Sequence, residues 1–183
     1  MTSPGSYRSV LRVYNGCSDP IRNFYCNFES LLNNYEYEVS VAYVFLKLEQ
    51  AYNRCLYGGV RKLHKVNAEI ASNILQKQHL TREGFLLLFE NVFSQSINSD
   101  VVKKIKFAEK VRDKIIHGKS VQDADKRKCL TDVLQYSREI EREVESIGGF
   151  NPFGDMRGVT GRAKPLEKST SRWVMKGLGF TTD

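Results

Sequence analysis

Apolar residues recur three and four positions apart along most of the chain, with polar and charged positions between them. Prolines and runs of β-branched residues are scarce, so the pattern predicts helices. We expect an all-α protein, a four- to five-helix bundle followed by a C-terminal loop and a short basic helix. The stretches with helical periodicity cover about residues 20–33, 35–57, 60–77, 81–93, 99–116 and 123–147.

The helix over 35–57 is predicted to be central, because it is apolar over much of its circumference. Its expected buried residues are Val39, Ala42, Tyr43, Leu46 and Ala51. Gly58 and Gly59 are predicted to end it. The helix over 60–77 would then bury one side, made of Leu63, Val66, Ile70 and Ile74, and Thr81 would cap the following helix.

The last two bundle helices have the clearest end signals. Ser99 or Asp100 can cap the first of them, and Gly118 can supply a left-handed residue after its last turn. Asp123 or Asp125 can cap the second, which Gly148 and Gly149 would end. Its predicted buried face follows a three–four spacing: Leu130, Val133 or Leu134, Ser137, Ile140, Val144 and Ile147.

Composition changes after the bundle, so we expect three segments. These are a flexible arm at 1–19, a helical bundle at 20–148, and a glycine-rich loop with a basic helix at 149–183. Pro165 suits the first turn of that last helix. Lys164, Lys168, Arg172 and Lys176 are spaced by four and would form a basic stripe opposite a narrow apolar side of Leu166, Trp173 and Val174.

The chain has a formal net charge of +7, and the charge is clustered. Between Val101 and Lys128 there are ten Lys or Arg residues and four Asp or Glu residues, an excess of six. Such a stretch suits a polyanion such as RNA, although a solvated lysine face would have the same composition. The longest apolar run is too short to span a bilayer, and the first residues lack the apolar core of a signal peptide, so we expect a cytoplasmic protein.

Arg112 interrupts an apolar helix face. On a helical wheel it lies in the middle of a sector formed by Val101, Ile105, Ala108, Ile115 and Ile116, opposite four lysines. A buried guanidinium must be paired or must reach solvent. Arg112 could therefore pair internally with a carboxylate such as Glu36 or Glu38, extend to the rim of an interface, or line a groove that binds an anion.

His117 precedes the glycine that ends the helix, where an imidazole also interacts favourably with the helix dipole. The stretch "RDKIIH" resembles the R-x4–6-H motif of HEPN domains, with Arg112, Asp113 and His117 at the matching positions. The resemblance extends over roughly residues 24–147 and implies an HEPN-like bundle. It also implies a metal-independent endoribonuclease that works as a homodimer, as a toxin or an antiviral defence effector.

In such an enzyme Arg112 would stabilise the phosphorane-like transition state, His117 would transfer protons, and Asp113 would orient one of the reacting groups. The product would be a 2′,3′-cyclic phosphate. Lys119 stands where toxins paired with a nucleotidyltransferase antitoxin carry tyrosine, which disfavours that subtype. A regulatory or antitoxin protein partner is compatible with the resemblance, and so is a non-catalytic adaptor or nucleic-acid-binding module.

The remaining candidates would bind RNA: Lys114, Lys119, Lys168, Arg172 and Lys176 through phosphates, and Trp173 by stacking on a base. Alternatively, Trp173 and Val174 dock the last helix on the bundle, or the tail binds a partner protein. No cofactor or metal motif is present, and the four scattered cysteines are expected to be buried free thiols. We expect His64 and His79 on exposed faces.

Overall fold

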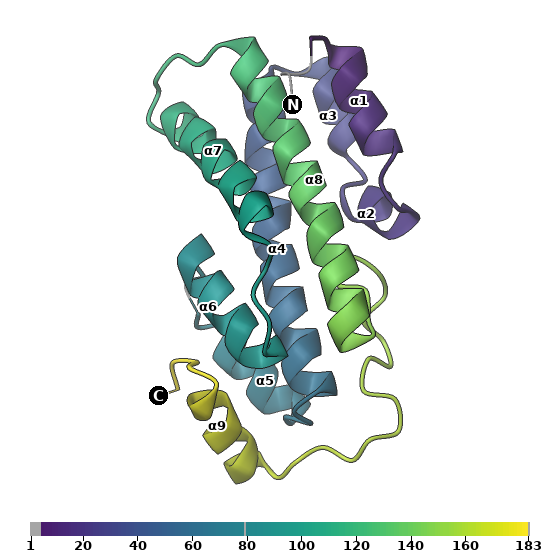
Figure 1. The fold of residues 1–183 in the computed structure, drawn as a ribbon, viewed down its shortest axis with the longest axis vertical. Coiled ribbons are helices and arrows are strands. Elements are labelled where there is room, and N and C mark those ends of the chain that lie inside the picture. The colour runs from purple at the N-terminus through teal and green to yellow at the C-terminus, as the bar shows by residue number, and fades with distance from the viewer. Residues whose placement is uncertain (1–4, 79, 183) are drawn as a thin grey trace. The chain divides into compact units, whose positions relative to one another are not determined.

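The computed structural model describes residues 5–78 and 80–182, and all regular elements among them are helices (Figure 1). The prediction of an all-α protein is therefore confirmed. In chain order the helices are α1 Tyr7–Asn15, α2 Asp19–Phe24, α3 Phe28–Asn34, α4 Tyr37–Lys62, α5 Ala68–Leu75, α6 Arg82–Phe93, α7 Ser99–Ile116, α8 Asp123–Gly148 and α9 Lys168–Gly177. Within the described ranges, no helix combines the length and the apolar character needed to cross a lipid bilayer.

The chain packs as two compact units, each made of two separate stretches. Unit 1 comprises the chain through Leu48 together with Asn98–Ile140. Unit 2 comprises Glu49–Ile97 together with the chain from Glu141 onward. The long helices α4 and α8 therefore each contribute residues to both units.

Residues 7–15 form helix α1, whereas the sequence predicted a flexible arm over 1–19; residues 1–4 of that arm lie outside the described residues. Val10 and Tyr14 of α1 are buried, and the Tyr14 hydroxyl donates to the carbonyl oxygen of Arg22 at 3.0 Å. The single helix expected over 20–33 is two helices, because Ser18 caps α2 and the chain turns at Tyr25 before α3. In Figure 1 these short helices lie beside α8, and buried Tyr25 is 2.9 Å from Ser137 of α8, hydroxyl to hydroxyl.

The part of α4 in unit 1 buries a different face from the predicted one. Val41, Val44, Phe45 and Leu48 are buried, whereas Val39 and Leu46 are 43% and 56% exposed. Because the helix is apolar on nearly all sides, its composition alone could not show which side faces the core.

In unit 2, α4 continues through Gly58 and Gly59, which the sequence predicted to be its end. These glycines are needed for close packing: a Cβ at Gly58 would lie 2.2 Å from the Phe150 ring, and one at Gly59 would lie 2.5 Å from Val92. The helix predicted over 60–77 does not form as one element. Lys65 has a positive φ of 56°, and the Asn67 side chain accepts the backbone N–H groups of Glu69 and Ile70 to begin α5.

The ends of α6, α7 and α8 agree closely with the sequence. Thr81 caps α6 by accepting the N–H of Gly84, as predicted. Asn98 caps α7 in place of Ser99 or Asp100. On α8 the predicted face is buried from Leu130 to Val144, and Ile147 is half-buried.

Candidate functional site

The Arg112 guanidinium lies on α7 in unit 1, between an acid and an aromatic ring. Its Nε and Nη2 atoms donate to Oδ1 of Asp113 at 3.0 and 2.8 Å. Its Cζ lies 4.9 Å from the centroid of the Phe45 ring of α4. The Arg112 side chain is 28% exposed, so it is shielded on one side and open to solvent on another.

Arg112 therefore pairs internally with a carboxylate, as one interpretation of the sequence proposed, but the acid is the neighbouring Asp113 and not Glu36 or Glu38. Glu36 is exposed, and Glu38 forms an ion pair with Lys126. Asp113 is 55% exposed, and an ion pair at that exposure contributes at most about 1 kcal/mol.

The apolar face around Arg112 is shifted relative to the predicted wheel. Val101, Ile105 and Ala108 are buried as expected, and Val111 is buried as well. Ile116 was expected on this face but is 68% exposed. Arg112 still lies inside the buried arc, so it does interrupt an apolar face.

His117 is the residue that closes the C-terminus of α7. The N–H of Lys119 donates to the carbonyl oxygen of Lys114 at 2.8 Å, and that of Gly118 donates to Ile115 at 3.0 Å. Gly118 has a φ of 67°, as the sequence predicted. These bonds form a Schellman cap, which fixes the backbone and leaves the His117 side chain exposed at the negative end of the helix dipole.

The cap determines how Arg112 and His117 are directed. The sequence left two ways of bringing them to one phosphate: an unwound last turn, or a second copy of the chain. α7 remains helical through Ile116, so the last turn is not unwound. Five residues then separate the two side chains by about 140° around the helix axis.

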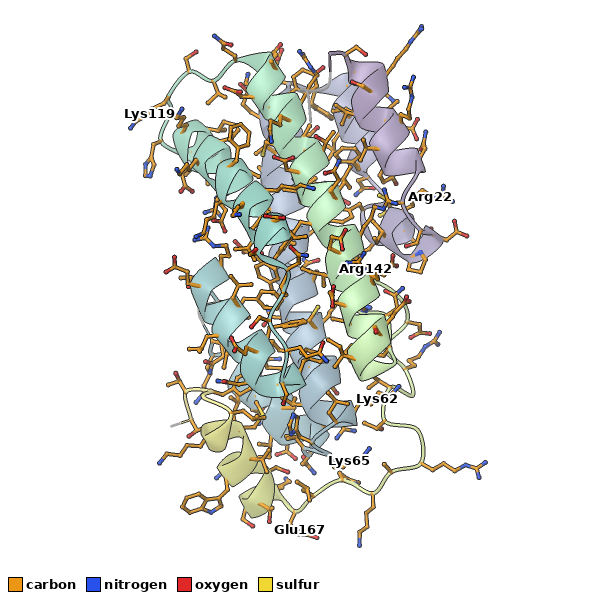
Figure 2. All side chains as sticks on the ribbon, viewed as in Figure 1. Arg22, Lys62, Lys65, Lys119, Arg142 and Glu167 are labelled. Carbon is orange, nitrogen blue, oxygen red and sulfur yellow. The ribbon has the colours of Figure 1, made fainter. Side chains whose placement is uncertain are left out.

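Two predicted phosphate-binding lysines belong to the same unit. Lys114 lies in the last turn of α7, and Lys119 follows Gly118, where its side chain extends from the loop (Figure 2). Both are exposed and available to a polyanion.

The other predicted RNA-binding residues belong to α9 in unit 2. Lys168 forms an ion pair with Glu69 of α5 at 2.5 Å. Arg172 and Lys176 are exposed, and Trp173 is 73% exposed. Pro165 lies before the helix, which begins after Glu167 (Figure 2), so Lys164 is not part of the helical stripe.

The face with which α9 packs is not the predicted one. Ser171 and Met175 are buried, and the Ser171 hydroxyl accepts the backbone N–H of Asn67 at 2.9 Å. Trp173 therefore does not dock the helix, contrary to one reading of the sequence. A small polar residue carries the docking contact, which an apolar pattern cannot reveal.

Two features next to the candidate residues were missed from the sequence. Phe45 was not identified as the platform for Arg112, because contacts between helices have no short-range sequence signal. Beside Arg172 lies a pocket of about 290 Å³ lined by both apolar and polar residues. Its lining includes Ile70, Ile74, Asn73, Gln76, Lys77 and Thr181.

Two other ionisable side chains of unit 1, Lys126 and Asp132, are buried and form ion pairs with more exposed partners. Lys126 donates to Glu38 and, at 3.1 Å, to Asp123, and the hydrogen bond from Lys126 lowers the pKa of Glu38. Burial raises the pKa of Asp132, although Lys128 donates to it. The pairs with Asp123 and Asp132 lie within α8, and the pair with Glu38 links α8 to α4. None of the three includes a residue of the predicted motif.

Histidine and cysteine side chains are dispersed. The Nε2 atom of half-buried His64 is 2.8 Å from the carbonyl oxygen of Val92, so His64 has a structural partner, contrary to expectation; His79 lies outside the described residues. Cys17, Cys55 and Cys129 are buried and Cys26 is exposed, all as free thiols. Across 5–78 and 80–182, no three His, Cys, Asp or Glu side chains are grouped to hold a metal ion.

No protein-family model, curated protein or solved structure matches this chain.

Proposed function

We propose that the protein is a metal-independent endoribonuclease of the HEPN type that acts as a homodimer. The observation that carries the proposal is the course of α7: a shielded arginine lies on the regular helix, and an exposed histidine is its C-cap residue. On a regular helix, a separation of five residues places two side chains about 140° apart around the axis. One copy cannot direct both side chains at one phosphate. Two copies related by a two-fold axis can, because each supplies the group that the other lacks.

The chemistry follows from the residue types. The His117 imidazole can either take the proton from a ribose 2′-hydroxyl or protonate the departing 5′-oxygen near neutral pH, and water can serve at the other position. Charge develops on the phosphorus oxygens, where the Arg112 guanidinium donates two hydrogen bonds in a fixed geometry. Asp113 holds that guanidinium by two hydrogen bonds until the phosphate binds.

Self-association is supported by apolar side chains exposed in unit 1. Ile116 lies beside His117 and is 68% exposed, and Leu46 follows Phe45 and is 56% exposed. Val39 is on the same face of α4 as Leu46, two turns away, and is 43% exposed. Burial of these three side chains in an interface between chains would remove them from water.

A non-catalytic nucleic-acid-binding module is the second candidate. The observation that favours it is that Arg112 is already engaged by Asp113 and Phe45, so the guanidinium has a structural role within one chain. In that case Lys114 and Lys119 would bind RNA without cutting it, with an affinity that falls steeply as salt rises.

The two functions are separated by incubating the full chain with labelled RNA in EDTA. Cleavage is expected for the natural protein and lost in Arg112→Ala and His117→Ala. Lys110→Ala is the matched control, because it removes one charge from the opposite face of the same helix and should cleave normally. Retained RNA that no form of the protein cuts would support the binding module.

A mixing experiment tests whether the site is shared between copies. Equal amounts of Arg112→Ala and His117→Ala chains are unfolded and refolded together. If each site takes arginine from one copy and histidine from the other, half of the dimers are mixed and one of their two sites is complete. About one quarter of the activity should then return. If both groups come from one chain, the mixture will stay inactive.

A further inference from the structure

We propose that α9 and the adjoining pocket in unit 2 form a second site, which binds single-stranded nucleic acid by stacking one base on Trp173 and holding a phosphate at Arg172. The inference is independent of the cleavage chemistry assigned to unit 1. Together with the proposed function, it makes an unpaired segment of RNA the substrate.

The exposure of Trp173 is the first argument. A tryptophan that is 73% exposed leaves a large apolar ring in water, while α9 is already held by buried Ser171 and Met175. Packing of the helix therefore does not account for the ring. Every base presents a flat face to an aromatic side chain, so stacking gives affinity without sequence preference.

The surroundings of Trp173 indicate a polyanion and disfavour an apolar partner. On the wheel, Arg172, Lys176 and Ser169 share the outward side of α9 with the indole, and all three are exposed. Of the basic residues on the helix, Lys168 is neutralised by Glu69, which leaves Arg172 and Lys176 as the pair beside the ring. A protein-docking surface would instead place apolar residues around the aromatic anchor.

The pocket beside Arg172 supplies a place for the backbone. Its volume of about 290 Å³ is close to the lower end of pockets that enclose small ligands, roughly 300 Å³. Arg172 and Lys77 contribute cationic groups, Asn73 and Gln76 contribute amides, and none of its described lining residues is acidic. Such a lining suits a phosphodiester group.

Hydrogen bonds fix the chain segments that form and adjoin the pocket. The Gln78 amide and the backbone of Thr181 exchange two hydrogen bonds, at 3.0 and 3.3 Å, which fix the chain after α9 against the end of α5. Asn91 donates to the carbonyl oxygen of Leu178 at 2.9 Å. The phosphate site at Arg172 and the stacking site at Trp173 are thus on a fixed helix, one residue apart in the sequence.

Trp173 is the single tryptophan of the sequence, so tryptophan fluorescence reports directly on this site. The full protein is titrated with 2′-O-methyl-oligo(U) and with oligo(dT), neither of which has a 2′-hydroxyl that the proposed nuclease could use. Saturable quenching of tryptophan emission is expected with these strands and not with duplex RNA. Because cleavage plays no part, failure of the nuclease proposal would leave this result unchanged, and the reverse also holds.

The second measurement is the affinity of variants for a labelled strand, determined from its fluorescence anisotropy. Trp173→Ala should weaken binding roughly 5- to 150-fold, the range for loss of one stacked base, and Trp173→Phe should restore most of it. Arg172→Ala should reduce the slope of log affinity against log salt by about 0.7, the value for one phosphate contact on a single strand. Arg142→Ala removes an exposed charge from α8 in unit 2 and is the matched control.

Three outcomes would overturn the proposal: emission unchanged by single strands, equal quenching by duplex RNA, or Trp173→Ala binding as tightly as the natural chain. A blue shift of the emission with phosphatidylserine vesicles but not with oligonucleotides would assign the indole to a membrane surface instead.

Discussion

The guanidinium of Arg112 stacks on the ring of Phe45, with 4.9 Å between Cζ and the ring centroid, while Asp113 holds its edge. Phe45 is 4% exposed and belongs to α4, so the position of the guanidinium depends on the packing of α4 against α7. The ring covers one side of the guanidinium, whose side chain is 28% exposed.

In the proposed nuclease, replacing Phe45 by leucine is therefore expected to lower the rate of RNA cleavage. A partly desolvated cation–π contact contributes about 1–2 kcal/mol, which corresponds to a loss of cleavage rate of roughly 5- to 30-fold. Phe107→Leu is the control, because Phe107 is a half-buried ring on α7 that contacts Lys128 instead. Equal cleavage by both variants, measured on labelled RNA, would contradict a role for the ring in positioning Arg112.

Gly118→Ala should destabilise the protein by about 1 kcal/mol, because its φ of 67° is unfavourable for any residue with a Cβ. A Cβ there would meet no atom within 4 Å, so the cost is conformational and not steric. Gly177→Ala is the control: that glycine ends α9 without a positive φ and also has open space around it. Urea denaturation should show a loss for the first variant and none for the second.

Gly58→Ala should lower the free energy of unfolding by about 1–3 kcal/mol. Here the cause is steric, because the added Cβ would overlap the Phe150 ring. Phe150→Ala removes the obstacle, so the double variant should be less destabilised than the sum of the two single variants. A thermodynamic cycle from urea denaturation measures this coupling. Additive effects would show that the ring does not limit the space at Gly58.

Glu38→Gln should cost about 1 kcal/mol at neutral pH, a value kept small because the Glu38 side chain is 40% exposed. In the folded chain, the hydrogen bond from Lys126 lowers the pKa of Glu38 below its ordinary value of 4.5. The pair therefore stabilises the fold above that pH, and its contribution is lost as the pH falls through the folded value. The difference between variant and natural protein should shrink accordingly in urea titrations at decreasing pH.

Glu36→Gln is the control for the acid dependence, because Glu36 is exposed just before α4. It should change stability little at any pH. A cost of Glu38→Gln that stays constant into the acid range would mean that the lost side-chain packing, and not the ion pair, is responsible.

The helical periodicity and the end signals of α6, α7 and α8 could be read from the sequence because they are local. Thr81 and Gly118 act on residues within four or five positions, and the three–four spacing of α8 matches the face that it buries. The arginine inside the apolar arc of α7 could be located for the same reason.

The misassigned elements depend on distant residues. Gly58 and Gly59 have the composition of a helix end, yet they lie inside α4 because Phe150 and Val92 occupy the space where side chains would be. Val39 and Leu46 were predicted to be buried in a helix that is apolar on most sides, and only the packed structure shows that Val41 and Phe45 are buried instead. Likewise, only the packed structure shows that Ser171, and not Trp173, makes the docking contact of α9.

The division of the chain has a consequence for its synthesis. Unit 1 needs Asn98–Ile140, and unit 2 needs residues from Glu141 onward, so neither is a continuous segment of chain. A chain leaving the ribosome cannot complete unit 1 until most of α8 has emerged, and unit 2 must wait for the last residues. A protein truncated after α8 would accordingly lack part of a folded unit and not merely a tail.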